Sequence, residues 1–218
     1  ENLISPINKE GDIKPAFLND GKVILPKSFS KAYKSIAEGG WIGISGATKY
    51  GGLGLPLIIT TCVNEILSSA CLSLALNPLM TQGQIDALES HANEDIKRLF
   101  LPKLNSGEWS GTMNLTEAQA GSDVGALRSV ANKDKDGTYK VSGQKIYISW
   151  GDHSLSSNIC HLLLARLPNS PKGTKGISLF LVPKYIPDNK GNLTGRNFIN
   201  TISLEHKMGL HGSPTAVL

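Results

Sequence analysis

The sequence changes character at Gly107, and this change constrains the fold class more than any other feature. Before it, apolar residues recur at helical spacing; after it, β-branched residues and turn signals prevail. No helical pattern separates the apolar runs of the second half, so the crossovers of a parallel βαβ sheet are not expected. The sequence therefore predicts an α+β chain, with an all-helical N-terminal domain (1–109) and an antiparallel β-barrel or sandwich domain (110–218).

The most hydrophobic segment, Leu55–Met80, is long enough to raise the question of a membrane span. Asn64 and Glu65 at its middle disfavour a span, and we expect a helix buried inside the helical domain. A helix should also begin after Asn93, whose side chain can accept a hydrogen bond from a first-turn amide. The other expected helices are Ser28–Glu38 and Gln82–His91.

The second half contains several short strands with turn signals between them. The expected strands are Gly111–Thr116, Leu127–Lys133, Thr138–Ser149, Ile159–Arg166, Ile177–Pro183, Phe198–Glu205 and one that starts at Thr215. The last runs to Leu218, and an apolar strand left at an open sheet edge is an aggregation hazard. We therefore expect a piece of a longer protein, which is incomplete at its start as well.

Composition bounds the partners and the compartment. The chain is 40% hydrophobic and 18% charged, as an ordered globular protein is. Its net charge of +4 is spread over single basic residues, so no nucleic-acid surface is expected, although an anionic cofactor would suit the sign.

The five histidines do not cluster, and no metal site is expected. Cys62, Cys71 and Cys160 form no CxxC pair, which indicates a reducing compartment. We expect the cytoplasm of a bacterium in preference to the mitochondrial matrix.

The first candidate site is the segment Gly111–Asp123, where a strand gives way to a loop of small residues. Gly121 allows the backbone to come close to a ligand, and amides in such a turn can face a phosphate. Ser122 adds a hydroxyl donor. Ser122 and Asp123 could equally form an Asx-type turn that binds nothing, so the loop alone does not decide the function.

The second candidate site is the segment Tyr139–Gly151. Tyr147 and Ser149 are two residues apart, so in a continuous strand their side chains would share one face. An aromatic ring and a hydroxyl on one face can hold a flat polar ring system by stacking and by a directed hydrogen bond. Such residues are common in strands, however, and the second motif is also ambiguous by itself.

In this order, the two motifs resemble the acyl-CoA dehydrogenase family. The family's pattern is a hydrophobic-Thr-Glu-x-x-x-Gly-Ser-Asp loop followed by Gly-x-Lys-x-aromatic-Ile-Thr/Ser, which stand here at Leu115–Asp123 and Gly143–Ser149. The resemblance extends from Lys49–Leu55 to Lys207–Leu210 and is strongest to the longer bacterial members. It implies FAD as cofactor, an acyl-CoA thioester as substrate, and a C-terminal helical bundle domain that is absent from these residues.

The resemblance also implies roles for individual residues. Tyr147 would contact the flavin ring, Ser149 would hydrogen-bond near its N5 atom, and Gly121 and Ser122 would lie near the pyrophosphate. Ser122 would meet the substrate as well. Ala118 stands where the family usually has proline, which should loosen the loop by about 0.4 to 1 kcal/mol. The full set of implied cofactor contacts is Met113, Leu115, Thr116, Gly121, Ser122, Tyr147, Ile148 and Ser149.

The reaction implied by the family is α,β-dehydrogenation, in which a carboxylate removes the α proton and a hydride leaves the β carbon for the flavin. The family's base is a glutamate of the C-terminal domain. Neither Glu65 nor Glu117 stands at that position, so we name no catalytic residue and expect these 218 residues alone to be inactive. The implied partners are an electron-transfer flavoprotein or a similar acceptor and, for the full-length protein, further copies in a homo-oligomer.

Two other functions stay open at this point. An acyl-CoA oxidase has a related architecture and the same first half-reaction, but passes its electrons to oxygen. A non-catalytic module that binds flavin or acyl-CoA would keep both motifs and lack the distant base.

Overall fold

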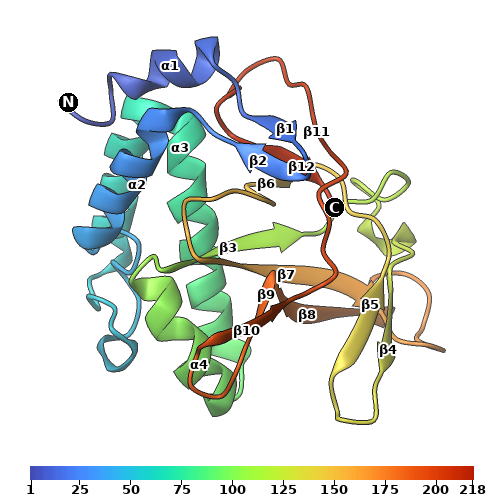
Figure 1. Cartoon of the computed structure of the whole chain (residues 1–218). Helices are drawn as coiled ribbons and strands as arrows, with labels where there is room; N and C mark the ends of the chain where they lie inside the picture. The colour runs from blue at the N-terminus through green and yellow to red at the C-terminus, as the bar shows by residue number, and fades with distance from the viewer.

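The computed structural model describes residues 1–218 and confirms the α+β class. Figure 1 shows the helices gathered on one side of the molecule and the strands on the other. The helices are α1 (Ile7–Ile13), α2 (Lys27–Glu38), α3 (Leu57–His91) and α4 (Glu94–Asn105). The strands are β1 (Phe17–Asn19), β2 (Lys22–Ile24), β3 (Trp109–Asn114), β4 (Val130–Lys133), β5 (Tyr139–Ser142), β6 (Ile148–Ser149), β7 (Asn158–Arg166), β8 (Ile177–Pro183), β9 (Tyr185–Pro187), β10 (Leu193–Arg196), β11 (Ser203–Leu204) and β12 (Thr215–Val217).

The N-terminal half is not all helical, because β1 and β2 form an antiparallel hairpin. Its two turn residues, Asp20 and Gly21, have φ angles of 46° and 71°. Positive φ at both central residues defines a type I′ turn, for which Asp-Gly is a preferred sequence. This dipeptide was the available sequence signal for the hairpin, and the prediction of an all-helical domain was wrong at this point.

One long helix replaces two predicted ones. α3 begins two residues later than the expected helix Leu55–Met80 and continues through the expected helix Gln82–His91, with a kink at Cys71, whose φ of −159° and ψ of 89° are not helical. α4 begins as expected, since the Asn93 side chain accepts a hydrogen bond from the Ile96 amide at 2.9 Å. Pro56 precedes the first residue of α3, a position where proline needs no amide hydrogen.

The first part of α3 is less buried than the sequence suggested. Leu57, Ile58 and Ile66 are 72%, 65% and 66% exposed, so an apolar face of this helix is open. By length and hydropathy alone, α3 is able to cross a membrane. Its second part, however, places buried polar groups against the sheet: the Thr81 hydroxyl accepts a hydrogen bond from the Gly111 amide, and the Asn77 amide lies 3.2 Å from His153 Nε2. Those contacts fit a helix packed on a sheet, because lipid could not satisfy such groups.

The main sheet is mixed, not antiparallel as expected. Its order is β3-β7-β4-β5, with β8 also paired to β7. β3 and β7 run parallel over six residue pairs, whereas β7–β8 and β4–β5 are antiparallel. The prediction assumed that a parallel pair needs a helical crossover, but here the chain between β3 and β7 is occupied by β4, β5 and β6. A second sheet, β11-β12-β6, is antiparallel.

Three predicted strands are shorter than expected, and one of them, Leu127–Lys133, is reduced to β4. Thr138–Ser149 is interrupted after β5, because the backbone bends away at Gly143 (φ 154°) and again at Tyr147 (φ 59°) before β6 begins. Phe198–Glu205 contributes only the two residues of β11, and the β9–β10 hairpin was not predicted. Alternation of apolar residues therefore located the strands better than it located their ends.

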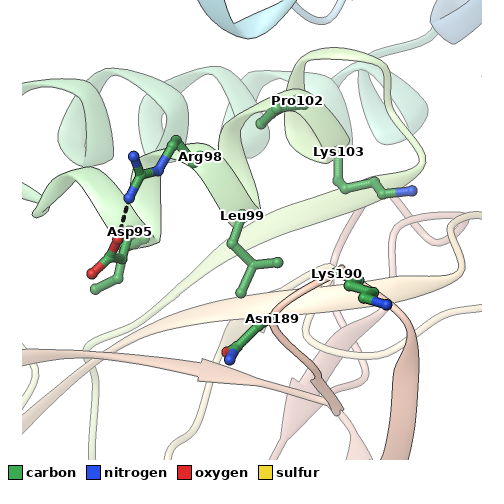
Figure 2. Close-up of a pocket in the computed structure, with 9 residues that line it drawn as sticks. Asp95, Arg98, Leu99, Pro102, Lys103, Asn189 and Lys190 are labelled. Atoms are coloured by element: carbon green, nitrogen blue, oxygen red, sulfur yellow. Dashed lines mark hydrogen bonds and ion pairs between the residues drawn. The ribbon is translucent and has the colours of Figure 1, made fainter.

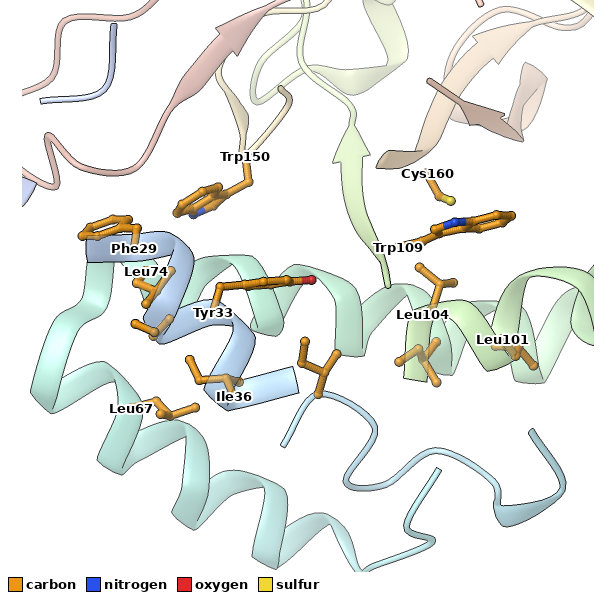
Figure 3. Close-up of a cluster of buried hydrophobic side chains, with 14 of the residues drawn as sticks. Phe29, Tyr33, Ile36, Leu67, Leu74, Leu101, Leu104, Trp109, Trp150 and Cys160 are labelled. Atoms are coloured by element: carbon orange, nitrogen blue, oxygen red, sulfur yellow. The ribbon is translucent and has the colours of Figure 1, made fainter. Parts of the chain in front are cut away.

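Two tryptophans join the helices to the strands (Figure 3). Trp150 is fully buried, stacks on Phe29 of α2 with ring centroids 6.4 Å apart, and donates its indole N–H to the Ser73 carbonyl of α3. Trp109, at the start of β3, packs edge-on against Phe100 of α4. Burial of such large rings stabilises a fold strongly, so these contacts fix β3 and the segment around β6 against the helical part.

Candidate functional site

The two motif segments lie side by side although about thirty residues separate them in the sequence. The Ile146 amide donates a hydrogen bond to the Thr116 carbonyl at 2.9 Å. The Thr112 hydroxyl donates to the Ser149 carbonyl at 2.7 Å, which ties β3 to β6. The chain that follows β3 and the chain that leads into β6 thus form one continuous surface.

Most of the predicted residues on this surface can meet a ligand. Met113, Leu115 and Thr116 are half-buried, as is Ser149. Ile148 is only 1% exposed, because it pairs with Ala216 of β12 and its side chain belongs to the interior. A contact of Ile148 with a ligand would therefore run through its backbone.

Tyr147 is 60% exposed, but the reason for its placement differs from the prediction. Its φ of 59° is in the left-handed region, so it does not belong to a regular strand. The alternation argument that put Tyr147 and Ser149 on one strand face does not apply. The backbone turn at Tyr147, which nothing in the local sequence announces, presents the ring to solvent at the start of β6.

A buried ion pair fixes the two segments against each other. Lys145 Nζ lies 2.9 Å from Glu117 Oε1 and also donates to the Leu115 carbonyl at 3.0 Å. Glu117 further accepts hydrogen bonds from the Arg128 amide and from the amide and hydroxyl of Ser129. The hydrogen bonds of this carboxylate thus make it a structural anchor at the base of the loop.

The electrostatics of Glu117 fit this role. Burial by itself raises the pKa of its carboxyl, but the hydrogen bonds from Ser129, Arg128 and Lys145 outweigh burial and lower the pKa to about 2. Burial lowers the pKa of the Lys145 amine, and Glu117 opposes that effect. Sequence reasoning gave neither residue a role, although a lysine inside an apolar strand pattern was a usable signal for a buried partner.

The loop tip extends away from this anchor. Reciprocal backbone hydrogen bonds between Glu117 and Ala120 make a tight turn, and Gly121, Ser122 and Asp123 beyond it are exposed. A Cβ atom added at Gly121 would meet no atom within 4 Å. The space beside Gly121 is therefore open to a ligand, as the phosphate interpretation requires.

These residues fit a flavin. A flavin needs an aromatic or apolar surface for its ring, hydroxyl or amide donors at the ring edge, and donors at its pyrophosphate. Tyr147 and Leu115 offer the first, Thr116 and Ser149 the second, and the open Gly121–Ser122 tip the third. No group of three His, Cys, Asp or Glu side chains is arranged to hold a metal ion.

A separate cavity of about 680 Å³ lies between α4 and the β9–β10 turn (Figure 2). It is lined by Leu99 and Lys103 from α4 and by Asn189, Lys190 and Gly191 from the turn. None of the eight predicted cofactor contacts is among its lining residues. The cavity is therefore a different feature of the surface.

Comparison with known proteins identifies the family. Residues 20–108 match the acyl-CoA dehydrogenase N-terminal domain, and residues 112–218 match the acyl-CoA dehydrogenase middle domain. The chain is 46% identical over 216 residues to the 3-methylmercaptopropionyl-CoA dehydrogenase of Ruegeria pomeroyi. That alignment covers 99% of this chain and 37% of the relative, so the chain spans little more than a third of the length of this relative.

Solved structures agree on the fold. The butyryl-CoA dehydrogenase of Megasphaera elsdenii superimposes with a TM-score of 0.76 at 24% identity, over 99% of this chain and 51% of that one. An acyl-CoA dehydrogenase from Bacillus anthracis, solved in complex with FAD, superimposes with a TM-score of 0.71 at 25% identity, over 87% of this chain and 30% of that one. With both domain matches and both motifs in place, the chain belongs to the acyl-CoA dehydrogenase family.

Proposed function

We propose that this chain forms the flavin-binding part of an acyl-CoA dehydrogenase, which oxidises the Cα–Cβ bond of an acyl-CoA thioester. The observation that carries the proposal is the contact between the two motif segments, where Ile146 donates to the Thr116 carbonyl beside Tyr147 and Ser149. FAD, when bound, supplies the acceptor for the hydride. The relatives named above support an acyl-CoA substrate, and the FAD complex of the Bacillus anthracis protein supports the cofactor.

Each side chain has a distinct task in this proposal. Tyr147 and Leu115 lie against the flavin ring, while Thr116 and Ser149 direct hydrogen bonds to its edge. A directed donor close to the hydride-accepting atom stabilises the charge that develops there during transfer. The remaining proposed contacts are the backbone at Met113 and Ile148 with the ring, Gly121 and Ser122 with the pyrophosphate, and Ser122 with the substrate.

The α proton needs a base that these residues do not supply. Glu117 is engaged by Lys145 and Ser129, and a carboxylate with a pKa of about 2 is a weak proton acceptor. Glu65 is exposed on the first part of α3 and belongs to neither motif segment. We therefore assign no catalytic base within residues 1–218.

The proposal extends to partners and location. We propose an electron-transfer flavoprotein or a similar protein as electron acceptor, a homo-oligomeric enzyme, and a bacterial cytoplasmic location. We also propose the domain boundary between residues 109 and 110, which lies after the first residue of β3 and four residues beyond the end of α4.

Stopped-flow reduction of the flavin by butyryl-CoA or 3-methylmercaptopropionyl-CoA tests the proposal in the FAD-loaded enzyme that contains these residues. Ser149→Ala should slow reduction about 5- to 10-fold, because one hydrogen bond at the ring edge is lost. Ser142→Ala, an exposed serine on β5, is the matched control and should leave the rate unchanged.

The other outcomes separate the alternative functions. Rapid oxygen consumption by the reduced enzyme would identify an oxidase. Bound FAD that no acyl-CoA reduces would indicate a binding module, and absence of FAD binding would refute the flavin site itself.

A further inference from the structure

Arg166, the last residue of β7, joins two loops through its guanidinium group. Its Nε atom donates a hydrogen bond to the Leu127 carbonyl at 3.0 Å, and its Nη2 atom donates one to the Gly125 carbonyl. Both acceptors follow the Gly121–Asp123 tip in the sequence. On the other side, Nη1 donates to Pro171 at 2.9 Å and Nη2 to Gly173 at 2.8 Å. Four backbone carbonyls from two loops therefore converge on one side chain.

Arg166 and Glu117 hold the same part of the loop through different backbone groups. Glu117 accepts hydrogen bonds from the amides of Arg128 and Ser129, whereas Arg166 donates to the carbonyls of Leu127 and Gly125, which lie one and three residues before Arg128. The negative side chain of Glu117 and the positive side chain of Arg166 thus hold neighbouring residues in the part of the loop that leads back to β4. Only the tip, from Gly121 to Asp123, extends beyond these two anchors.

The guanidinium is closely packed. A Cβ atom at Gly176 would lie 1.8 Å from the Pro171 carbonyl oxygen and 2.6 Å from Arg166 Nη1. A Cβ atom at Gly125 would lie 3.3 Å from the Gly173 Cα atom, so the two loops touch around the side chain. The arginine guanidinium is planar and carries five donors, so it suits this narrow space and its four acceptors. A single ammonium group would not suit them.

The charge of Arg166 is not neutralised by a carboxylate. None of the eight ion pairs of the chain includes Arg166. Its positive charge meets only carbonyl dipoles, at the base of the loop whose tip is exposed. Arg166 therefore places the loop through hydrogen bonds and not through an ion pair.

We propose that Arg166 is a positioning residue for the FAD pyrophosphate: it holds the 121–127 loop so that the amides of the Gly121–Ser122 tip face the phosphates. The inference rests on the proposed flavin function. Arg166 acts through the loop and does not contact the flavin ring, which meets the 115–116 and 147–149 segments. Loss of its side chain should therefore weaken FAD binding without changing the environment of the ring.

The test compares Arg166→Met with Arg98→Met, an equal chemical change at an exposed arginine of α4. FAD is titrated into the apoenzyme by fluorescence quenching. We expect Arg166→Met to raise the Kd for FAD about 10- to 100-fold, whereas Arg98→Met leaves it unchanged. Arg166→Lys should recover only part of the affinity. At saturating FAD, the visible absorption spectrum of Arg166→Met should equal that of the wild type.

A second measurement uses the protein without FAD. Hydrogen exchange of residues 119–127 should be faster in Arg166→Met than in Arg98→Met, with the β3 and β7 amides unchanged. An FAD affinity of Arg166→Met within twofold of the control overturns the inference, as does a changed flavin spectrum, which would indicate general misfolding. Failure of the wild type to bind FAD would instead refute the proposed function, and the exchange experiment would still decide whether Arg166 orders the loop.

Discussion

The Nζ atom of Lys145 lies 2.9 Å from Oε1 of Glu117, and only 3% and 5% of the two side chains are exposed. This pair connects the loop after β3 to the segment before β6. Both segments carry proposed flavin contacts, so the shape of the site depends on an interaction that does not itself touch a ligand.

Lys145→Met should lower the free energy of unfolding by about 3 to 5 kcal/mol, because it leaves the buried Glu117 carboxylate without its cation. Urea unfolding at pH 7 measures the loss. Lys140→Met is the matched control: its pair with Asp134 has a 79% exposed lysine, and its loss should cost less than about 1 kcal/mol. Equal losses for the two variants would show that the buried pair is not an anchor.

Glu117 also makes stability depend on pH. Its pKa is about 2 in the folded protein and lies near 4.5 without these contacts, so the folded state favours the ionised form. The contribution is fully present above pH 4.5, on the order of 3 kcal/mol, and is lost as pH falls towards 2. Unfolding free energies measured from pH 6 to pH 2 should show a steeper fall for the wild type than for Glu117→Gln. Parallel profiles would contradict the assignment.

His153 should make the protein sensitive to milder acid. Burial lowers its pKa to about 3, its Nδ1 accepts the Leu155 amide, and its Nε2 lies 3.0 Å from the Ser110 hydroxyl. The neutral form is favoured in the fold, so stability should be complete above pH 6.5 and decrease as pH falls towards 3. His153→Asn should reduce the slope between pH 6.5 and 4.5, whereas His91→Asn, at an exposed site, should not. An unchanged slope in the first variant would refute this role.

Gly111 is required for the approach of α3 to β3. A Cβ atom there would lie 1.9 Å from Gln84 Oε1, so Gly111→Ala should destabilise the protein by about 1 to 3 kcal/mol. The loss should be smaller in a Gln84→Ala background, which removes the clashing amide. Gly83→Ala, where no atom lies within 4 Å, should stabilise α3 by about 0.5 to 1 kcal/mol. Thermal unfolding of the four variants checks this, and a neutral Gly111→Ala would show that the helix can move away.

Local sequence patterns determined a large part of the fold. Each of these patterns depends only on neighbouring residues. Examples are the change from helical to strand patterns at Gly107, the helix cap at Asn93 and the apolar run of β8, all of which could be predicted from the sequence. The Asp20–Gly21 turn was equally local and was missed, as was the possibility that strands form the connection between two parallel strands. The order of the two motifs was sufficient for the family.

Tertiary structure alone decided how these parts meet. The parallel pairing of β3 with β7 and the left-handed turn at Tyr147 depend on contacts between distant segments, which no local pattern encodes. The same holds for the partners of Lys145 and Arg166, because a long charged side chain can reach many positions and its hydrogen-bond acceptors are set by the packed backbone around it. The sequence thus determined which residues could meet a flavin, and packing decided which charges hold them in place.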